Sequence, residues 1–318
     1  MPRFIARRLG LALITVLLIS MLIFIGTQLM PGDVARRVLG PFATTAAVDA
    51  LNARLGTDRP VLVQYWDWIS HAVRGDLGFP AISSTRPVTE LLGRALANSA
   101  KLAAVAFVIV VPLSILGGVV AALRRDRLID RIITVGGLSA TVIPEFVSGI
   151  ILILVFAIWL DWLPGTAAAP LGSGFFVQLK HLILPSIPLV LVLFGYIARI
   201  TRAGVIEALE ADYTRTAILK GSPRAEVIRR EVLRNALLPT IAVVASQVGY
   251  LIGGLVVVEV LFNYQGIGRL LYDAAQNADF PLLAGTVLVV AVAFQVSMLL
   301  ADLAYGWLNP RIRLGGME

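Results

Sequence analysis

Apolar residues in this chain are gathered into long stretches that carry almost no charge. A stretch of about 18 apolar residues or more can span the hydrocarbon core of a bilayer as a helix. Six stretches meet this length, and one of them contains a single acid, Glu145. The stretches are residues 9–32, 102–123, 132–160, 181–198, 235–258 and 280–301. The pattern predicts an all-α polytopic membrane protein with six transmembrane helices.

Residues 162–179 also lack charge, but helix-breaking residues interrupt them. The breakers are Pro164, Gly165, Pro170, Gly172 and Gly174. We therefore expect a loop between the third and fourth spans.

The first apolar stretch has an alternative interpretation as a signal peptide, because Arg3, Arg7 and Arg8 precede it. Its apolar run is longer than a signal core of about 7–15 residues, and no A-x-A-like cleavage site follows it. We therefore expect it to be retained as a transmembrane helix.

The basic residues are divided unequally between the two sides that six spans define. Seventeen of the 27 lysines and arginines fall on the side that holds both termini. They are Arg3, Arg7, Arg8, Arg124, Arg125, Arg127, Arg131, Arg199, Arg202, Arg215, Lys220, Arg224, Arg229, Arg230, Arg234, Arg311 and Arg313. Seven of the other ten lie in one long loop, and long loops have little influence on orientation. The distribution predicts cytoplasmic N- and C-termini, and it explains the net charge of +7 without a nucleic-acid partner.

Composition narrows the class of protein further. Hydrophobic residues make up 58% of the chain and charged residues 15%, against about 25% charged residues in an ordinary soluble domain. These values exclude a soluble enzyme and a disordered chain. The absence of cysteine excludes disulfides and thiolate metal sites.

The outer segment between the first two spans, residues 33–97, is long enough to form a small cap. Within it, residues 61–73 have the spacing of an amphipathic helix, with Val61, Tyr65, Trp68 and Ile69 near one face. Contact of this cap with a protein that delivers a substrate is compatible with the pattern but does not follow from it.

The inner segment, residues 199–234, is polar, basic and rich in helix-forming residues. Residues 204–220 are expected to form one helix. Gly221, Ser222 and Pro223 then stop it and start a second helix over 224–236, with Ser222 as its cap. A helix-turn-helix of this size is typical of a docking element, and a solvated basic loop near anionic lipid is the alternative.

Residues 212–221, DYTRTAILKG, resemble the coupling-loop signature of permeases in binding-protein-dependent ABC importers. Residues 233–239, LRNALLP, are similar to the end of that signature. The generic signature has Glu-Ala-Ala where this chain has Arg215, Thr216 and Ala217, and its glycine and proline are closer together. Both departures resemble the dipeptide, oligopeptide and nickel branch of the family.

Further resemblances to that branch are distributed over nearly the whole chain. They are MPGD at 30–33, LGTDRP at 55–60, RGDLG at 74–78, HLILP at 181–185, Glu259 with LFNYQGIGRLL at 261–271, and NPRIR at 309–313. Together they resemble the first of the two permeases that such systems usually carry.

The resemblance implies a type I ABC importer transmembrane domain in a bacterial inner membrane. It implies as partners a second homologous permease, two cytoplasmic ABC ATPase subunits, an extracytoplasmic substrate-binding protein and the lipid bilayer. The chain has no G-x-x-x-x-G-K-[ST] phosphate loop, so ATP and Mg²⁺ are expected on the ATPases. We therefore expect a protein that is not an enzyme and has no catalytic residue, metal or cofactor of its own.

The expected organisation has four parts. Residues 1–32 form the N-terminal tail and first span, 33–97 the outer loop domain, and 98–308 a five-helix core. The core includes a cytoplasmic coupling loop at 199–234, and residues 309–318 form a cytoplasmic tail.

The resemblance places contacts with an ATPase in the coupling loop. The candidate residues are Asp212, Tyr213, Arg215, Thr216, Ala217, Lys220, Gly221 and Pro239. Gly221 would allow a sharp turn and Ala217 a close approach. Arg215 and Lys220 would pair with acids of the ATPase, or remain solvated.

Ionisable and polar residues at membrane depth are candidates for the translocation path. We select Glu145, Gln247, Tyr250 and Glu259. Glu145 follows Pro144, which should bend the third span, and it would meet a substrate amine or hydrogen-bond within the helix packing. Glu259 would lie at the outer mouth or serve packing.

The predicted function is a permease subunit that imports di- or oligopeptides. Permeases with the same architecture that import nickel chelates, glutathione, opines or oligosaccharides are alternatives. A stand-alone secondary transporter would leave the docking element unexplained. An intramembrane enzyme is disfavoured because His71 and His181 form no H-E-x-x-H motif.

Overall fold

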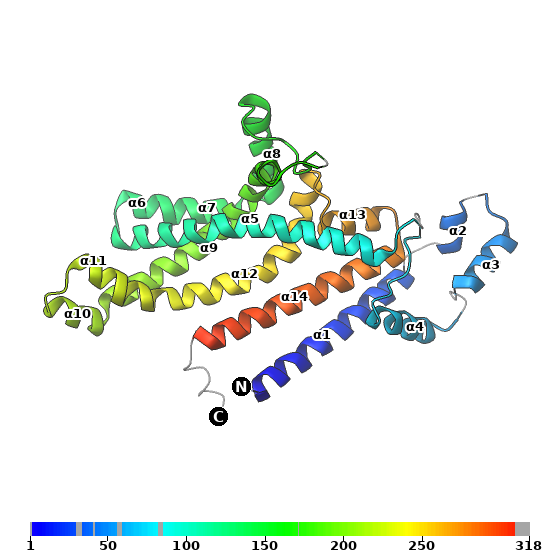
Figure 1. Cartoon of the computed structure of the whole chain (residues 1–318), viewed down its shortest axis with the longest axis horizontal. Coiled ribbons are helices and arrows are strands. Elements are labelled where there is room, and N and C mark those ends of the chain that lie inside the picture. Colours follow the sequence, from blue (N-terminus) through cyan, green and yellow to red (C-terminus); the bar gives the residue numbers. More distant parts are fainter. Residues whose placement is uncertain are drawn as a thin grey trace. The chain divides into compact units, whose positions relative to one another are not determined.

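The computed structural model describes residues 2–29, 34–40, 42–55, 59–81, 85–170 and 172–308 (Figure 1). Within those ranges every regular element is a helix. Five helices are long and apolar enough to cross a membrane, and a bent pair counted as one span gives a sixth. The predicted all-α fold with six spans is confirmed.

The helices follow one another along the chain with short connections. They are α1 (Pro2–Leu29), α2 (Val34–Leu39), α3 (Thr45–Leu55), α4 (Val61–Val73), α5 (Val88–Leu123), α6 (Leu128–Arg131), α7 (Gly137–Val142), α8 (Glu145–Leu152), α9 (Phe175–Glu210), α10 (Asp212–Leu219), α11 (Arg224–Val227), α12 (Leu233–Leu261), α13 (Ile267–Gln276) and α14 (Phe280–Leu308). Three π-helical segments, Ile132–Gly136, Ile153–Trp159 and Ile228–Val232, join neighbouring α-helices without a break.

The chain forms two compact units. One comprises Met1–Ser99 with Gln265–Gln295, and the other comprises Ala100–Tyr264 with Val296–Glu318. Helices α5 and α14 each contribute to both units.

In the first unit, the amphipathic helix expected over 61–73 is present as α4 and contacts α1. The hydroxyls of Ser20 on α1 and Tyr65 on α4 are 2.8 Å apart. The Phe24 ring lies 5.5 Å from that of Tyr65 and 5.8 Å from that of Trp68, between ring centres. Tyr65 and Trp68 thus share a face as predicted, whereas Val61 is exposed.

The other part of the first unit is a small core formed by α5, α13 and α14. Its buried members are Val88, Leu92, Ala95, Ile267, Ala274 and Leu282. The backbone N–H of Ile267 donates to Ser99 Oγ at 2.7 Å, so the start of α13 is attached to α5.

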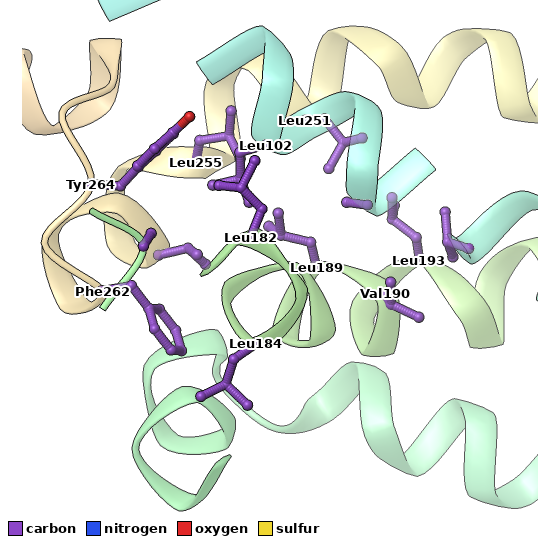
Figure 2. Close-up of a cluster of buried hydrophobic side chains, with 14 of the residues drawn as sticks. Leu102, Leu182, Leu184, Leu189, Val190, Leu193, Leu251, Leu255, Phe262 and Tyr264 are labelled. Atoms are coloured by element: carbon purple, nitrogen blue, oxygen red, sulfur yellow. The ribbon is translucent and has the colours of Figure 1, made fainter. Parts of the chain in front are cut away.

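In the second unit, α9 is the most buried of the spans, with 61% of its apolar window inside the protein. It packs against α12, α7 and α8. Figure 2 shows the main core, where leucines of α9 such as Leu182 and Leu189 meet Leu102 of α5 and Leu255 of α12. Gly204 lets α9 approach α12 closely, because a Cβ there would lie 2.6 Å from the Ala236 carbonyl oxygen.

The third span is broken in the middle. Ile143 is extended (φ −72°, ψ 122°), and α8 begins directly after Pro144. The two halves of the span are inclined by 104°. A residue before proline avoids helical backbone angles, so the predicted bend is confirmed. Residues 160–174 between the third and fourth spans contain no helix among those described, as the prolines and glycines indicated.

The inner segment differs from the predicted helix-turn-helix. Residues 204–220 are two helices, because α9 continues from the membrane to Glu210 and Ala211 is extended (ψ 149°) before α10. The stop at 220–223 is confirmed, but the residue before α11 is Pro223 rather than Ser222. The predicted helix over 224–236 is the beginning of a continuous helical run into α12, widened by the π-helical turn.

Some sequence predictions fall outside the described residues. These are the motif at 30–33, residues 56–58 of the second motif, and the tail at 309–318. The predicted domain boundaries remain predictions.

Candidate coupling and translocation site

The coupling candidates are concentrated at one end of the second unit, where α10 and α11 lie beside the ends of α9 and α12 (Figure 1). Thr214 anchors α10 from below: its side chain is 1% exposed, and its hydroxyl donates to the Ala208 carbonyl of α9 at 2.7 Å. Ala217 packs against a core of the inner helices. That core consists of Ala122, Val205, Ala208, Val227, Val232 and Ala236.

The close approach that Ala217 permits is therefore with helices of its own chain. A larger side chain at this position would separate α10 from α9 and α11. Its contact with an ATPase stays a prediction.

Gly221 has φ +80°, in the left-handed region that glycine adopts without steric cost. Its N–H donates to the Ile218 carbonyl at 2.9 Å, and the Ser222 N–H donates to the Ala217 carbonyl at 3.3 Å. These bonds close the end of α10 and direct the chain into α11. The turn predicted from Gly221 is confirmed.

The outward face of the element carries charged, polar and apolar residues. Asp212, Tyr213, Arg215, Thr216 and Lys220 are all exposed. Burial of its inner part and the negative charges of Glu207 and Glu231 raise the pKa of Tyr213, so its hydroxyl remains a neutral donor at physiological pH.

Two further residues on this face escaped the sequence analysis. Ile218 is 59% exposed and Leu219 is 80% exposed. Apolar side chains exposed beside one another mark protein contacts when they lie outside the bilayer. Their position in the segment between two spans was a usable signal, but helical periodicity did not show which of the apolar residues points outward. Pro239, by contrast, lies within α12 and not on α10.

A buried ion pair lies under this surface. Asp130 of α6 is 3% exposed. Arg202 of α9 donates to it through Nε at 2.6 Å and through Nη2 at 2.7 Å. The same carboxylate accepts from the Thr134 hydroxyl at 3.1 Å and from the Asp126 N–H at 2.9 Å. The pair joins the beginning of the third span to the helix that carries α10.

The membrane-level candidates occupy different surroundings. Glu145 is partly buried in the first turn of α8, where the Ser148 hydroxyl donates to its carbonyl at 3.0 Å. Glu259 is 0% exposed near the end of α12. Its burial in this conformation agrees with the packing alternative.

Beyond the end of α12, Tyr264 lies at the edge of the main core (Figure 2). Burial and the nearby charge of Glu259 raise the pKa of Tyr264 to about 12. The Tyr264 N–H also donates to the Glu259 carbonyl at 2.8 Å. The chain is therefore held in a tight reversal directly after α12.

Gln247 lines a cavity of about 430 Å³ between α7, α9 and α12. Thr141, Tyr196 and Arg199 line the same cavity, whereas Glu145 and Glu259 do not. The side chain of Tyr250 lies outside the described residues. The structure thus separates the four path candidates, and their roles in transport stay predictions.

No group of three His, Asp or Glu side chains within the described part of the chain is placed to hold a metal ion. The expectation that ATP and Mg²⁺ bind to partner subunits remains a prediction.

These features define a polytopic membrane transport subunit with an inner docking element. Residues 114–314 match the family described as the binding-protein-dependent transport system inner membrane component, and residues 1–110 match its N-terminal domain family. The chain belongs to this family of ABC importer permeases. Its transmembrane domain is of the type I class, and it is a multi-pass protein of the inner membrane.

Full-length relatives share this assignment. The glutathione transport system permease protein GsiC of Escherichia coli O6:H1 is 36% identical over 309 residues, which are 97% of this chain and 98% of the relative. The proteins of the same name from Escherichia coli K12 and Shigella flexneri serotype 5b are each 35% identical over the same shares of the two chains. These relatives are permease subunits, in agreement with the predicted non-enzymatic class.

Proposed function

We propose that this chain is a permease subunit of an importer for glutathione or a closely similar short peptide. The observation that carries the proposal is the identity of 35–36% to glutathione permeases over nearly the full length of both chains. Sequence motifs alone favoured di- and oligopeptides and left glutathione as an alternative. Glutathione is itself a small peptide with carboxylates, an amino group and amide bonds, so the two classes require similar recognition.

The proposed assembly contains a second homologous permease, two cytoplasmic ABC ATPases and an extracytoplasmic binding protein. ATP and Mg²⁺ would be held by the ATPases, because this chain has no phosphate loop. Binding-protein delivery would supply most of the substrate specificity.

In the proposed coupling step, the outward face of α10 and the turn at Gly221 dock on an ATPase. Ile218 and Leu219 would fill an apolar groove, and Arg215 and Lys220 would pair with acids at its rim. Movement of the ATPase would reach α9 through Thr214 and through the core around Ala217, because these contacts hold α10 against the long helices.

The test is uptake of radiolabelled glutathione into proteoliposomes that contain the complete complex, with ATP inside and the binding protein outside. We expect ATP-dependent uptake that unlabelled glutathione suppresses more strongly than dipeptides, nickel chelates or oligosaccharides do. Uptake of one of those compounds without uptake of glutathione would overturn the substrate assignment. Transport by the permeases without ATPase subunits would instead support a stand-alone transporter.

A further inference from the structure

The cavity between α7, α9 and α12 has polar groups on three of its sides. Thr141 comes from α7, Tyr196 and Arg199 from α9, and Gln247 from α12; Leu138 and Val192 supply apolar wall. Its volume of about 430 Å³ is within the range of about 300–1,000 Å³ typical of small-molecule sites. All of these residues belong to the second compact unit.

Arg199 does not reach toward the cytoplasm as a lipid-facing arginine at a span's end would. Side chains on a helix lean toward its N-terminus, and the N-terminus of α9 is on the outer side in the orientation that the basic residues indicate. The Arg199 Cζ accordingly lies 5.9 Å from the centre of the Tyr196 ring, nearly one turn closer to the membrane. A cation over an aromatic face is stabilised there.

The neighbouring arginine of α9 shows the contrast. Arg202 is occupied by its bidentate bonds to Asp130. Arg199 instead lines the cavity, so its planar fork of donors is directed to a space large enough for a ligand.

Contact with lipid would be unfavourable for this set of side chains. Gln247 is 14 residues into α12, or about 21 Å along the helix at 1.5 Å per residue. An amide at that depth together with a guanidinium is costly against hydrocarbon. The cavity is therefore suited to a water-accessible or protein-lined path.

A carboxylate is the ligand group that best fits this arrangement. The guanidinium of arginine matches a carboxylate with two parallel hydrogen bonds, and the hydroxyls and amide supply donors and acceptors for peptide groups. We propose that this cavity is an inner substrate subsite, where Arg199 binds a carboxylate of the peptide or glutathione on its way to the cytoplasm. The inference rests on the proposed function for the identity of its ligand.

The test measures binding of radiolabelled glutathione to the permease and ATPase complex in lipid nanodiscs, without ATP or binding protein. The nanodiscs are made from phosphatidylcholine alone or with phosphatidylglycerol, because a lipid phosphate shares the chemistry of a carboxylate. We expect Arg199→Gln to weaken binding by about ten- to hundredfold, as loss of a charge-assisted pair does, and Arg199→Lys to weaken it less. Arg131→Gln is the matched control, because it removes an exposed inner arginine outside the cavity, and it should bind as the unmodified complex does.

Two results would overturn the subsite. One is equal binding by Arg199→Gln and the unmodified complex, and the other is no binding to an unmodified complex that transports glutathione in proteoliposomes. An Arg199→Gln effect confined to retention of phosphatidylglycerol would assign the arginine to lipid and also overturn it. Failure of the proposed function has a different signature, because the unmodified complex would then transport another substrate and not glutathione.

Discussion

The base and the rim of the inner docking element are built from opposite kinds of contact. The base consists of the Asp130–Arg202 pair, Thr214 and the core that receives Ala217, all of which are buried or largely buried. The rim consists of exposed residues of α10 and the turn at Gly221. The difference teaches that one short segment has two separable tasks: the base holds α10 on the long helices, and the rim is available to a partner.

The exposed pair between Arg125 and Glu210 makes the same comparison within the ion pairs. Its single bond of 2.8 Å joins side chains that are 53% and 68% exposed, whereas Asp130 is 5% exposed at the side chain. Exposed pairs contribute about 0–1 kcal/mol. The buried pair is therefore the one whose disruption should be visible in stability.

The largest expected effect comes from Asp130→Ala. It leaves the guanidinium of Arg202 without its carboxylate in a mostly buried place, which costs about 3 kcal/mol. The melting temperature of the purified complex should fall markedly, while Glu210→Ala, the exposed counterpart, should leave it nearly unchanged. Equal losses in the two variants would contradict the distinction between the buried and exposed pairs.

The next effect is expected from Gly204→Ala at the contact of α9 with α12. The new Cβ would meet the Ala236 carbonyl oxygen at 2.6 Å, and overpacking of this kind costs about 1–3 kcal/mol. Gly93→Ala on α5 is the matched control, because a Cβ at Gly93 meets nothing within 4 Å. Thermal unfolding should show opposite or unequal shifts; identical shifts would show that α9 and α12 are not in close contact there.

A smaller effect on stability and a large effect on transport are expected from Gly221→Asp. A non-glycine residue in the left-handed region costs about 1–2 kcal/mol, and the new carboxylate repels an acidic rim on the ATPase. Gly221→Asn carries a similar backbone cost without the charge. We expect normal membrane insertion for both and loss of ATP-driven uptake for Gly221→Asp; normal uptake by that variant would remove the coupling assignment.

The smallest effect on stability is expected from Leu219→Ser on the rim. Because this side chain is 80% exposed, the melting temperature of the permease pair should change little, as for most surface substitutions. Binding of the ATPase, measured by titration of nanodisc-embedded permeases, should weaken by about tenfold if Leu219 fills an apolar pocket. Unchanged affinity would exclude Leu219 from the interface.

The sequence by itself determined the features that depend on local chemistry. Six apolar stretches predicted the spans, Pro144 predicted the bend, and Gly221 with Pro223 predicted the turn after α10. The bounds of α4 also followed from periodicity. These features could be read directly because segment length, proline geometry and glycine backbone freedom act within a few neighbouring residues.

Only the tertiary structure decided what depends on residues far apart in the chain. The continuation of α9 to Glu210, the pairing of Asp130 with Arg202 across 72 positions and the cavity around Arg199 are of this kind. Local sequence could not distinguish Arg199 from Arg202, because both are arginines at the inner end of one helix. Their different environments arise from which neighbouring helix each side chain meets when α9 packs into the core.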